Sequence, residues 1–174
     1  MRPYHLIKLV EWAGELQGRK RLQKVVFLLQ AAGCKAFDAD FILHRFGPYS
    51  SEVAGLADQL VANRLLTETE QANPVVGTRF SYQLTDVAKK ALADVEHDEK
   101  GAVLAAPLKD FETKACELLE ADVSDLEYGA TIVYFYQRTK DWEKALTQAC
   151  TFKALAPESR SARTALKLAH TIVA

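Results

Sequence analysis

The sequence has few cysteines and no long apolar run, and both features limit the classes of protein to which it can belong. Its 174 residues include three cysteines, Cys34, Cys116 and Cys150, which are far apart and form no Cys-x-x-Cys motif. We therefore expect buried free thiols in a reducing compartment rather than a metal site. No apolar stretch approaches the roughly 20 residues of a membrane span, and the polar N-terminus is unlike a signal peptide. These features predict a cytoplasmic protein without a membrane anchor.

The chain also lacks a motif for catalysis or for a cofactor. No glycine-rich loop suits a phosphate, and no histidine has a metal-ligand spacing. His44 stands beside Arg45 and near Tyr49, and an imidazole can act as an acid or a base near neutral pH. No Ser, Cys or carboxylate completes such a site at a motif spacing, so we expect a structural, hydrogen-bonded His44. The sequence predicts a non-enzymatic protein that holds no cofactor and no metal.

Charge is segregated along the chain, although the net charge is only −1. Residues 1–66 hold nine Lys/Arg and six Asp/Glu, residues 94–127 hold three and eleven, and residues 137–170 hold seven and three. Solvated helix faces are one explanation. The other is attraction between acidic and basic segments, within the fold or across a dimer, which would leave less positive field for nucleic acid.

The hydrophobic pattern of the first hundred residues predicts helices and a hairpin. The predicted elements are helices at residues 4–16, 19–33, 51–63 and 87–96, a short strand at 41–44, and strands at 65–70 and 78–84. Pro and Gly punctuate residues 71–77, so the last two strands form a β-hairpin. This is the order of a winged-helix domain, in which helix 51–63 has the position of a recognition helix and the hairpin is the wing.

A corner precedes the third helix. Gly47 can adopt a positive φ, and Pro48 fixes its own φ and keeps Gly47 out of the helical region. Ser50 or Ser51 can cap the helix that follows, with Glu52 in its first turn. We therefore expect extended chain to end at a rigid turn here and a helix to begin.

The remainder of the chain is predicted to be helical. Pro107 is expected to open a helix that runs to Ala121, and Ser124 and Glu127 form a capping box at the start of an aromatic-rich helix. Helices at 142–155 and 157–173 follow. The predicted fold class is mainly α: a winged-helix-like head of three helices and a small hairpin wing at residues 1–100, and a helical extension packed on it at 101–174.

Three places in the chain carry a family resemblance. Residues 22–28 read LQKVVFL, residues 44–50 read HRFGPYS, and residues 126–132 read LEYGATI, followed later by Phe152-Lys153. In these places the chain resembles the YwgA-like proteins of bacteria and archaea, which are related to the Panacea domain of many antitoxins. The resemblance extends over roughly residues 4–170. It implies a winged-helix-like head, a helical tail and a role as a regulator or partner, with no catalytic residues to transfer.

Nucleic-acid binding is the first functional hypothesis, since winged helices place their third helix in the major groove. Residues 51–64 offer one base, Arg64, against two acids, Glu52 and Asp58, so phosphate binding needs help from other cations. The predicted nucleic-acid set is Arg19, Lys20, Arg21, Lys24, Arg45, Ser51, Arg64 and Arg79. A solvated helix start is the alternative for the four cations at residues 19–24.

Protein interaction is the second hypothesis. The corner residues His44, Gly47, Pro48, Tyr49 and Ser50 are predicted either to bind a partner or to hold the turn. We expect a transcription regulator or a regulatory protein of similar kind, acting through DNA or through a partner encoded nearby, such as a toxin or defence component. A pure protein-interaction adaptor without nucleic-acid binding is the alternative, and a homodimer is compatible with the apolar tail.

Overall fold

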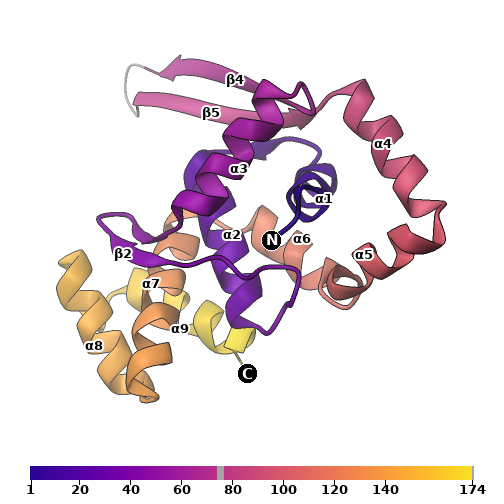
Figure 1. The fold of residues 1–174 in the computed structure, drawn as a ribbon. Helices are drawn as coiled ribbons and strands as arrows, with labels where there is room; N and C mark the ends of the chain where they lie inside the picture. The colour runs from indigo at the N-terminus through magenta and orange to yellow at the C-terminus, as the bar shows by residue number, and fades with distance from the viewer. Residues whose placement is uncertain (74–76, 174) are drawn as a thin grey trace.

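The protein is mainly helical, with a small antiparallel sheet at one end (Figure 1). The computed structural model describes residues 1–73 and 77–173, and these contain nine helices and five strands. The predicted mainly-α class is confirmed. Among these helices, none is both long enough and apolar enough to cross a bilayer.

The first half of the chain folds around α2 (Arg19–Ala31). Apolar residues at helical spacing give this helix so wide a stripe that eight consecutive residues, Leu22 to Leu29, are buried. Helix α3 (Ser51–Ala62) lies against it, and α1 (Pro3–Ala13) packs on α3 and joins the same hydrophobic core. The predicted extension of the first helix to Leu16 is wrong, because Gly14 adopts φ +65° and ends α1.

The three-stranded sheet has the order β1–β5–β4 and is antiparallel throughout. Its strands are β1 (Leu16–Gln17), β4 (Leu66–Asn73) and β5 (Gly77–Leu84). The predicted hairpin is confirmed, with Leu66 opposite Leu84 and Glu70 opposite Phe80. Part of its predicted turn, at residues 74–76, lies outside the described residues. Strand β1 joins through the pair Leu16 and Tyr82, both buried.

The predicted corner contains a second hairpin, made of β2 (Ile42–His44) and β3 (Gly47–Tyr49). Ile42 lies opposite Tyr49, and His44 lies opposite Gly47. Gly47 has the expected positive φ, +83°. The cap of α3 is Ser50, whose Oγ accepts a hydrogen bond from the Val53 amide at 3.4 Å. The start of α3 is therefore as predicted, but the turn lies at residues 45–46, and Gly47 and Pro48 belong to strand β3.

Two predicted helix starts in the second half are wrong. Pro107 lies in the last turn of α5 (Glu99–Lys109), where its missing N–H removes a bond only near the end of the helix. Asp122, and not Ser124, caps α7 (Val123–Thr139), because its carboxylate accepts hydrogen bonds from the next amides at 2.7 and 3.3 Å. Thr85 caps α4 (Asp86–Glu96), because its Oγ1 accepts a hydrogen bond from the Ala88 amide at 3.2 Å.

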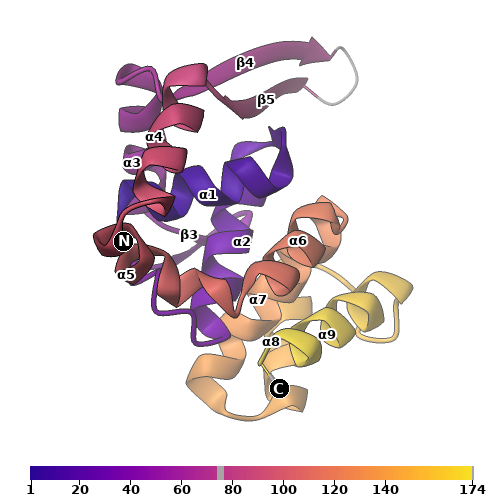
Figure 2. The ribbon, with the colours of Figure 1, turned by 90° about the vertical axis from the view of Figure 1, so that its right-hand side faces the viewer.

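Helix α7 is the centre of the second half and packs on α2 (Figures 1 and 2). It is flanked by α8 (Trp142–Lys153) and α9 (Arg160–Val173), while α6 (Glu112–Glu120) packs on α1 and α2. One hydrophobic core runs through both halves. The predicted domain boundary at residue 100 falls inside α5 and stays a prediction.

Aromatic side chains of the tail stack on one another. The ring centroids of Tyr136 and Trp142 are 3.7 Å apart, and those of Trp142 and His170 are 4.2 Å apart. Tyr134 is buried, and the first two of these rings are partly buried. These contacts join α7, α8 and α9, so the aromatic residues hold the tail helices together.

The glycines of α5 and α3 give a matched pair of stability tests. A Cβ on Gly101 would lie 1.6 Å from the Val95 carbonyl oxygen, whereas one on Gly55 would meet no atom within 4 Å. We expect Gly101→Ala to lower the free energy of unfolding by about 2 kcal/mol or more, because the backbone must move. Gly55→Ala should raise it by about 0.5–1 kcal/mol, because alanine favours the helix. Urea unfolding of both variants checks this, and an unchanged Gly101→Ala protein would contradict the close packing.

Candidate functional site

Segments that are distant in the sequence meet at the β2–β3 hairpin. Strand β3 packs against both α2 and α7, and the end of α8 reaches the hairpin turn through Lys153 (Figure 1). The three places that carry the family resemblance are therefore neighbours in space. Their contacts are built from polar groups as well as from apolar packing.

Helix α2 binds the hairpin through two buried polar side chains. The Gln23 amide donates to the Ser50 carbonyl at 2.9 Å and accepts from the Ser50 N–H at 2.8 Å. Lys24 Nζ donates to the Pro48 carbonyl at 2.7 Å. Because backbone groups buried without partners are costly, these bonds hold residues 48–50 in one position on α2.

Helix α7 contacts the hairpin at Gly47. A Cβ on this residue would lie 2.8 Å from Thr131 Oγ1 and 3.2 Å from the Glu127 carbonyl oxygen. The Thr131 hydroxyl itself donates to that carbonyl at 2.7 Å. Together with φ of +83°, this close approach leaves room only for glycine.

Glu127 is the acidic residue of the site. Its carboxylate accepts from Lys153 Nζ at 2.6 Å and lies 3.6 Å from Lys20 Nζ. Lys153 Nζ also donates to the Arg45 carbonyl in the hairpin turn, at 3.0 Å. The acidic middle of the chain thus meets the basic head and the basic tail at this one carboxylate, so these charges attract within the fold.

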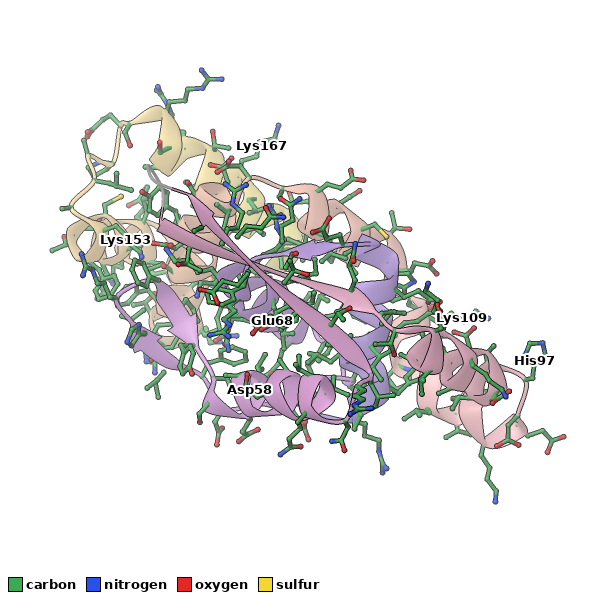
Figure 3. The ribbon with its side chains drawn as sticks, turned by 90° about the horizontal axis from the view of Figure 1, so that it is seen from above. Asp58, Glu68, His97, Lys109, Lys153 and Lys167 are labelled. Carbon is green, nitrogen blue, oxygen red and sulfur yellow. The ribbon has the colours of Figure 1, made fainter. Side chains whose placement is uncertain are left out.

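A cavity of about 330 Å³ lies between α2, the β2–β3 hairpin, α3 and β5. Its walls are aromatic and basic. The lining residues are Arg19, Lys20, Leu22, Gln23, Lys24, His44, Phe46, Gly47, Tyr49, Ala54, Ala57, Asp58 and Tyr82. Figure 3 shows Asp58 on α3 and Glu68 on the crossing strands of the β4–β5 hairpin.

Lys24 has an unusual environment for a lysine. The residue is only 2% exposed, and burial lowers the pKa of its ammonium to about 8. The charge of Glu127 favours the ammonium, whereas the charges of Lys153 and Lys20 oppose it. Burial is the largest of these effects, so the charged form is destabilised at neutral pH.

The outer face of the β2–β3 hairpin is apolar and exposed. Ile42 is 63% exposed, Phe46 39% and Tyr49 37%. The cross-strand pairing puts Ile42 beside Tyr49, and the His44 ring centroid lies 5.8 Å from that of Tyr49 and 6.4 Å from that of Phe46. We call Ile42, His44, Phe46 and Tyr49 the hairpin face.

The four cations at the start of α2 have partners within the protein. Arg19 donates to both carboxylate oxygens of Glu68, at 2.9 and 2.8 Å. Lys20 lies near Glu127, and Lys24 is buried. Arg21 Nη1 donates to the carbonyls of Leu119 and Ala121 at 2.7 and 2.5 Å. The acidic segment at residues 94–127 therefore folds against this basic cluster.

The other predicted nucleic-acid residues are exposed and dispersed. Arg45 is in the β2–β3 turn, Ser51 begins α3, and Arg79 is on β5. Arg64 follows α3 with φ +57°. Arg45 and Lys20 both lie over the Phe46 ring, and Arg19 lies over the ring of Phe80, the residue after Arg79. The predicted nucleic-acid set stays a prediction.

The predicted corner residues divide into two groups. Gly47, Pro48 and Ser50 are buried and hold the turn, while His44 and Tyr49 are exposed on the hairpin face.

In the described ranges, no three His, Cys, Asp or Glu side chains form a potential metal site. Cys34 and Cys150 are buried free thiols, and Cys116 is a free thiol that is partly buried.

Several residues of the site were not predicted, namely Gln23, Glu127, Thr131 and Lys153. A signal for the first was present, because Gln23 and Lys24 interrupt the apolar residues of the helix predicted at residues 19–33. Two adjacent long polar side chains on a buried face require buried partners. The partners themselves are more than twenty residues away, and periodicity does not reveal them.

Neither a protein-family model nor a curated protein sequence matches the chain.

The Gln23 contact can be tested by substitution. Gln23→Leu keeps the helix but leaves the Ser50 N–H buried without a partner, while the Ser50 carbonyl keeps only its bond from the Ala54 amide. We therefore expect the free energy of unfolding to fall by about 1–3 kcal/mol. Gln148→Leu, at an exposed position of α8, is the matched control and should change it by less than about 0.5 kcal/mol. Equal effects in urea unfolding would contradict a specific role for Gln23.

Burial of Lys24 predicts a dependence of stability on pH. The unfolded chain holds this proton up to about pH 10.5 and the folded chain only to about pH 8. Below pH 8 the folded state carries a buried ammonium, which lowers its stability. Between pH 8 and pH 10.5 the unfolded state binds more protons than the folded state, so stability rises with pH until this cost is gone. The stability of the wild type relative to Lys24→Met should therefore rise by about 3 kcal/mol from pH 7 to above pH 10.

Unfolding curves at several pH values measure this difference. Lys167→Met, at an exposed lysine, controls for the general effect of losing an ammonium. Its difference from the wild type should be constant over the same range. A constant difference for Lys24→Met as well would show that Lys24 is not held in a destabilising environment.

Proposed function

We propose that this protein is a non-enzymatic cytoplasmic regulator of the winged-helix type that acts by binding a partner protein. The order α1, β1, α2, α3, β4, β5 and the sheet order β1–β5–β4 support the winged-helix part of the proposal. In this arrangement α3 takes the position of the recognition helix, and the β4–β5 hairpin is the wing. The helices from α5 onward form the tail.

We also propose membership of the YwgA-like family, related to the Panacea domain. The support is spatial: the three places of resemblance meet at one hairpin, through Gln23 and Ser50, Lys24 and Pro48, and Gly47 beside Thr131. The resemblance to an antitoxin-associated domain favours a partner encoded nearby, such as a toxin or a defence component.

The observation that carries partner binding is the hairpin face. Exposed aliphatic and aromatic side chains gathered at one place are typical of protein interfaces. The hairpin is rigid, because α2 and α7 hold its buried side. Lys20 and Arg45 are exposed beside its Phe46 ring. A partner with an apolar patch bordered by acidic residues would complement this surface.

DNA binding is the second candidate. It is favoured by the β4–β5 hairpin, which extends from the body as a wing does and carries the exposed Arg79 (Figure 2). It is opposed by α3, which contains Glu52 and Asp58 and no Lys or Arg. Arg19 and Arg21 are bound within the protein and Lys24 is buried, so of the α2 cluster only Lys20 is exposed with a long contact, and few cations remain for a DNA backbone.

Co-purification with the products of neighbouring genes tests the partner proposal. A partner found in this way is purified and its affinity is measured against the wild type, Ile42→Asp and Val103→Asp. Both residues are exposed apolar side chains, at 63% and 75%, and α5, which carries Val103, lies far from the hairpin (Figure 1). We expect Ile42→Asp to weaken binding by about tenfold or more and Val103→Asp to leave it unchanged.

The outcomes separate the possible interfaces. Loss of binding in both variants, or in neither, contradicts the hairpin face as the docking surface. If light scattering shows a dimer that Ile42→Asp converts into a monomer, the partner at this face is a second copy of the chain.

A gel-shift series tests the DNA candidate. With most of the basic cluster bound internally, we expect no complex with duplex DNA even at ~50 mM salt, where electrostatic binding is strong. A complex whose affinity falls steeply with salt, and falls further in Arg79→Ala, would instead favour the wing and α3 as the binding surface.

A further inference from the structure

We propose that the cavity between α2, the β2–β3 hairpin and α3 binds a small organic anion, in which a carboxylate or phosphate is carried on a planar apolar group. Its volume of about 330 Å³ lies within the range of pockets that hold small molecules. The cavity shares His44, Phe46 and Tyr49 with the hairpin face, whereas Ile42 is not among its lining residues. The inference goes beyond partner binding because its ligand is a small molecule held in a concave site.

The charges that line the cavity favour an anion. Three cations line it, Arg19, Lys20 and Lys24, against one carboxylate, Asp58. Arg19 is bound by Glu68 through two hydrogen bonds and contributes little free charge. The cations that remain for a ligand are therefore Lys20 and Lys24.

The charge of one carboxylate, Glu127, acts on both Lys20 and Lys24, and Glu127 also binds a third lysine, Lys153. Glu127 makes its short contact, 2.6 Å, with Lys153, and its contact with Lys20 is longer, 3.6 Å. The groups that face Lys24 are thus two ammonium groups and one carboxylate that is bound mainly elsewhere. An added anion would restore the balance of charge.

Lys24 has the capacity to bind such an anion. An ammonium group has three N–H donors, and within residues 1–73 and 77–173 the structure gives its Nζ one hydrogen bond, to the Pro48 carbonyl. A buried ammonium with donors to spare gains more from an anionic partner than an exposed one, because water does not screen the interaction.

The apolar part of the ligand is suggested by the rings on the wall. Phe46, Tyr49 and Tyr82 line the cavity together with the His44 imidazole. Lys20 Nζ lies 3.6 Å from the centre of the Phe46 ring, so ring and cation already form one surface. A planar apolar group fits between such rings, with its acidic group directed toward Lys24.

Three probes that share a phenyl ring test the site: phenyl phosphate, phenylacetate and the neutral phenylacetamide. Backbone and lysine side-chain NMR signals of the full chain are followed during titration. We expect titration with one of the two anions to saturate the site, with a Kd on the order of 1 mM or tighter. Its shifts should centre on residues 19–24 and 44–49, and phenylacetamide should bind at least about tenfold more weakly. The tighter anion identifies the acidic group.

Four substitutions distinguish a binding role from a structural one. Lys24→Met and Lys20→Met should each weaken the anion about tenfold, and the half-exposed Lys20 keeps the test valid if Lys24→Met does not fold. Lys167→Met, on α9 and distant from Asp58 in Figure 3, should have no effect. Asp58→Asn removes the carboxylate of the lining and should strengthen anion binding severalfold without changing phenylacetamide.

Anion binding should also raise the pKa of Lys24 above its value of about 8 in the free protein, so affinity should fall as pH rises past that value. Equal binding of the neutral and charged probes, shifts spread over other lysines, or no response to Asp58→Asn would overturn the proposal. Ile42 does not line the cavity, so Ile42→Asp should still bind the anion, and the partner proposal can fail or succeed independently.

Discussion

The structure depends on buried polar bonds between α2 and the β2–β3 hairpin. Gln23 satisfies both backbone groups of Ser50, and Lys24 satisfies the carbonyl of Pro48. Since Ser50 also caps α3, the same bonds set where that helix begins and how it lies against α2. Gly47 then allows α7 to approach the other side of the turn. One short hairpin therefore joins the sheet-bearing half of the chain to the helical tail, and a ligand or partner at the hairpin would contact the centre of the fold.

The same contacts redistribute the charge that the sequence displays. A chain with nine basic residues among its first 66 suggests a positive surface. At the start of α2, however, Arg19 binds Glu68, Lys20 lies near Glu127, and Arg21 binds backbone carbonyls at the end of α6. Exposed ion pairs of this kind add little stability, but they lower the potential available to phosphate groups. Lys24 is different, because among residues 1–73 and 77–173 no carboxylate is hydrogen-bonded to its buried ammonium. This difference in pairing is the physical reason for assigning an anion to the cavity, which shares His44, Phe46 and Tyr49 with the hairpin face.

Much of the fold is predictable from the sequence, because long amphipathic helices such as α2 and α3 and the β4–β5 hairpin have clear periodicity. Strands β1 and β3 are not predictable, since a run of two or three residues shows no periodicity and becomes a strand only by pairing with a partner strand. The start of α5 depends on tertiary packing around Gly101, which overrides the local preference of Pro107 for a first turn. Within the site, the corner is readable from Gly47, Pro48 and Ser50. The approach of Glu127 and Lys153 is not, because it depends on how α7 and α8 pack.

The central claim is that the hairpin face, rather than α3 and the β4–β5 hairpin, is the working surface of this protein. Hydrogen exchange with and without the purified partner tests it most directly, since each backbone amide reports whether its own region becomes protected. The account predicts slower exchange at residues 42–49, with α3 and residues 66–73 and 77–84 unchanged. Protection of α3 and the β4–β5 hairpin, with residues 42–49 unchanged, would contradict it.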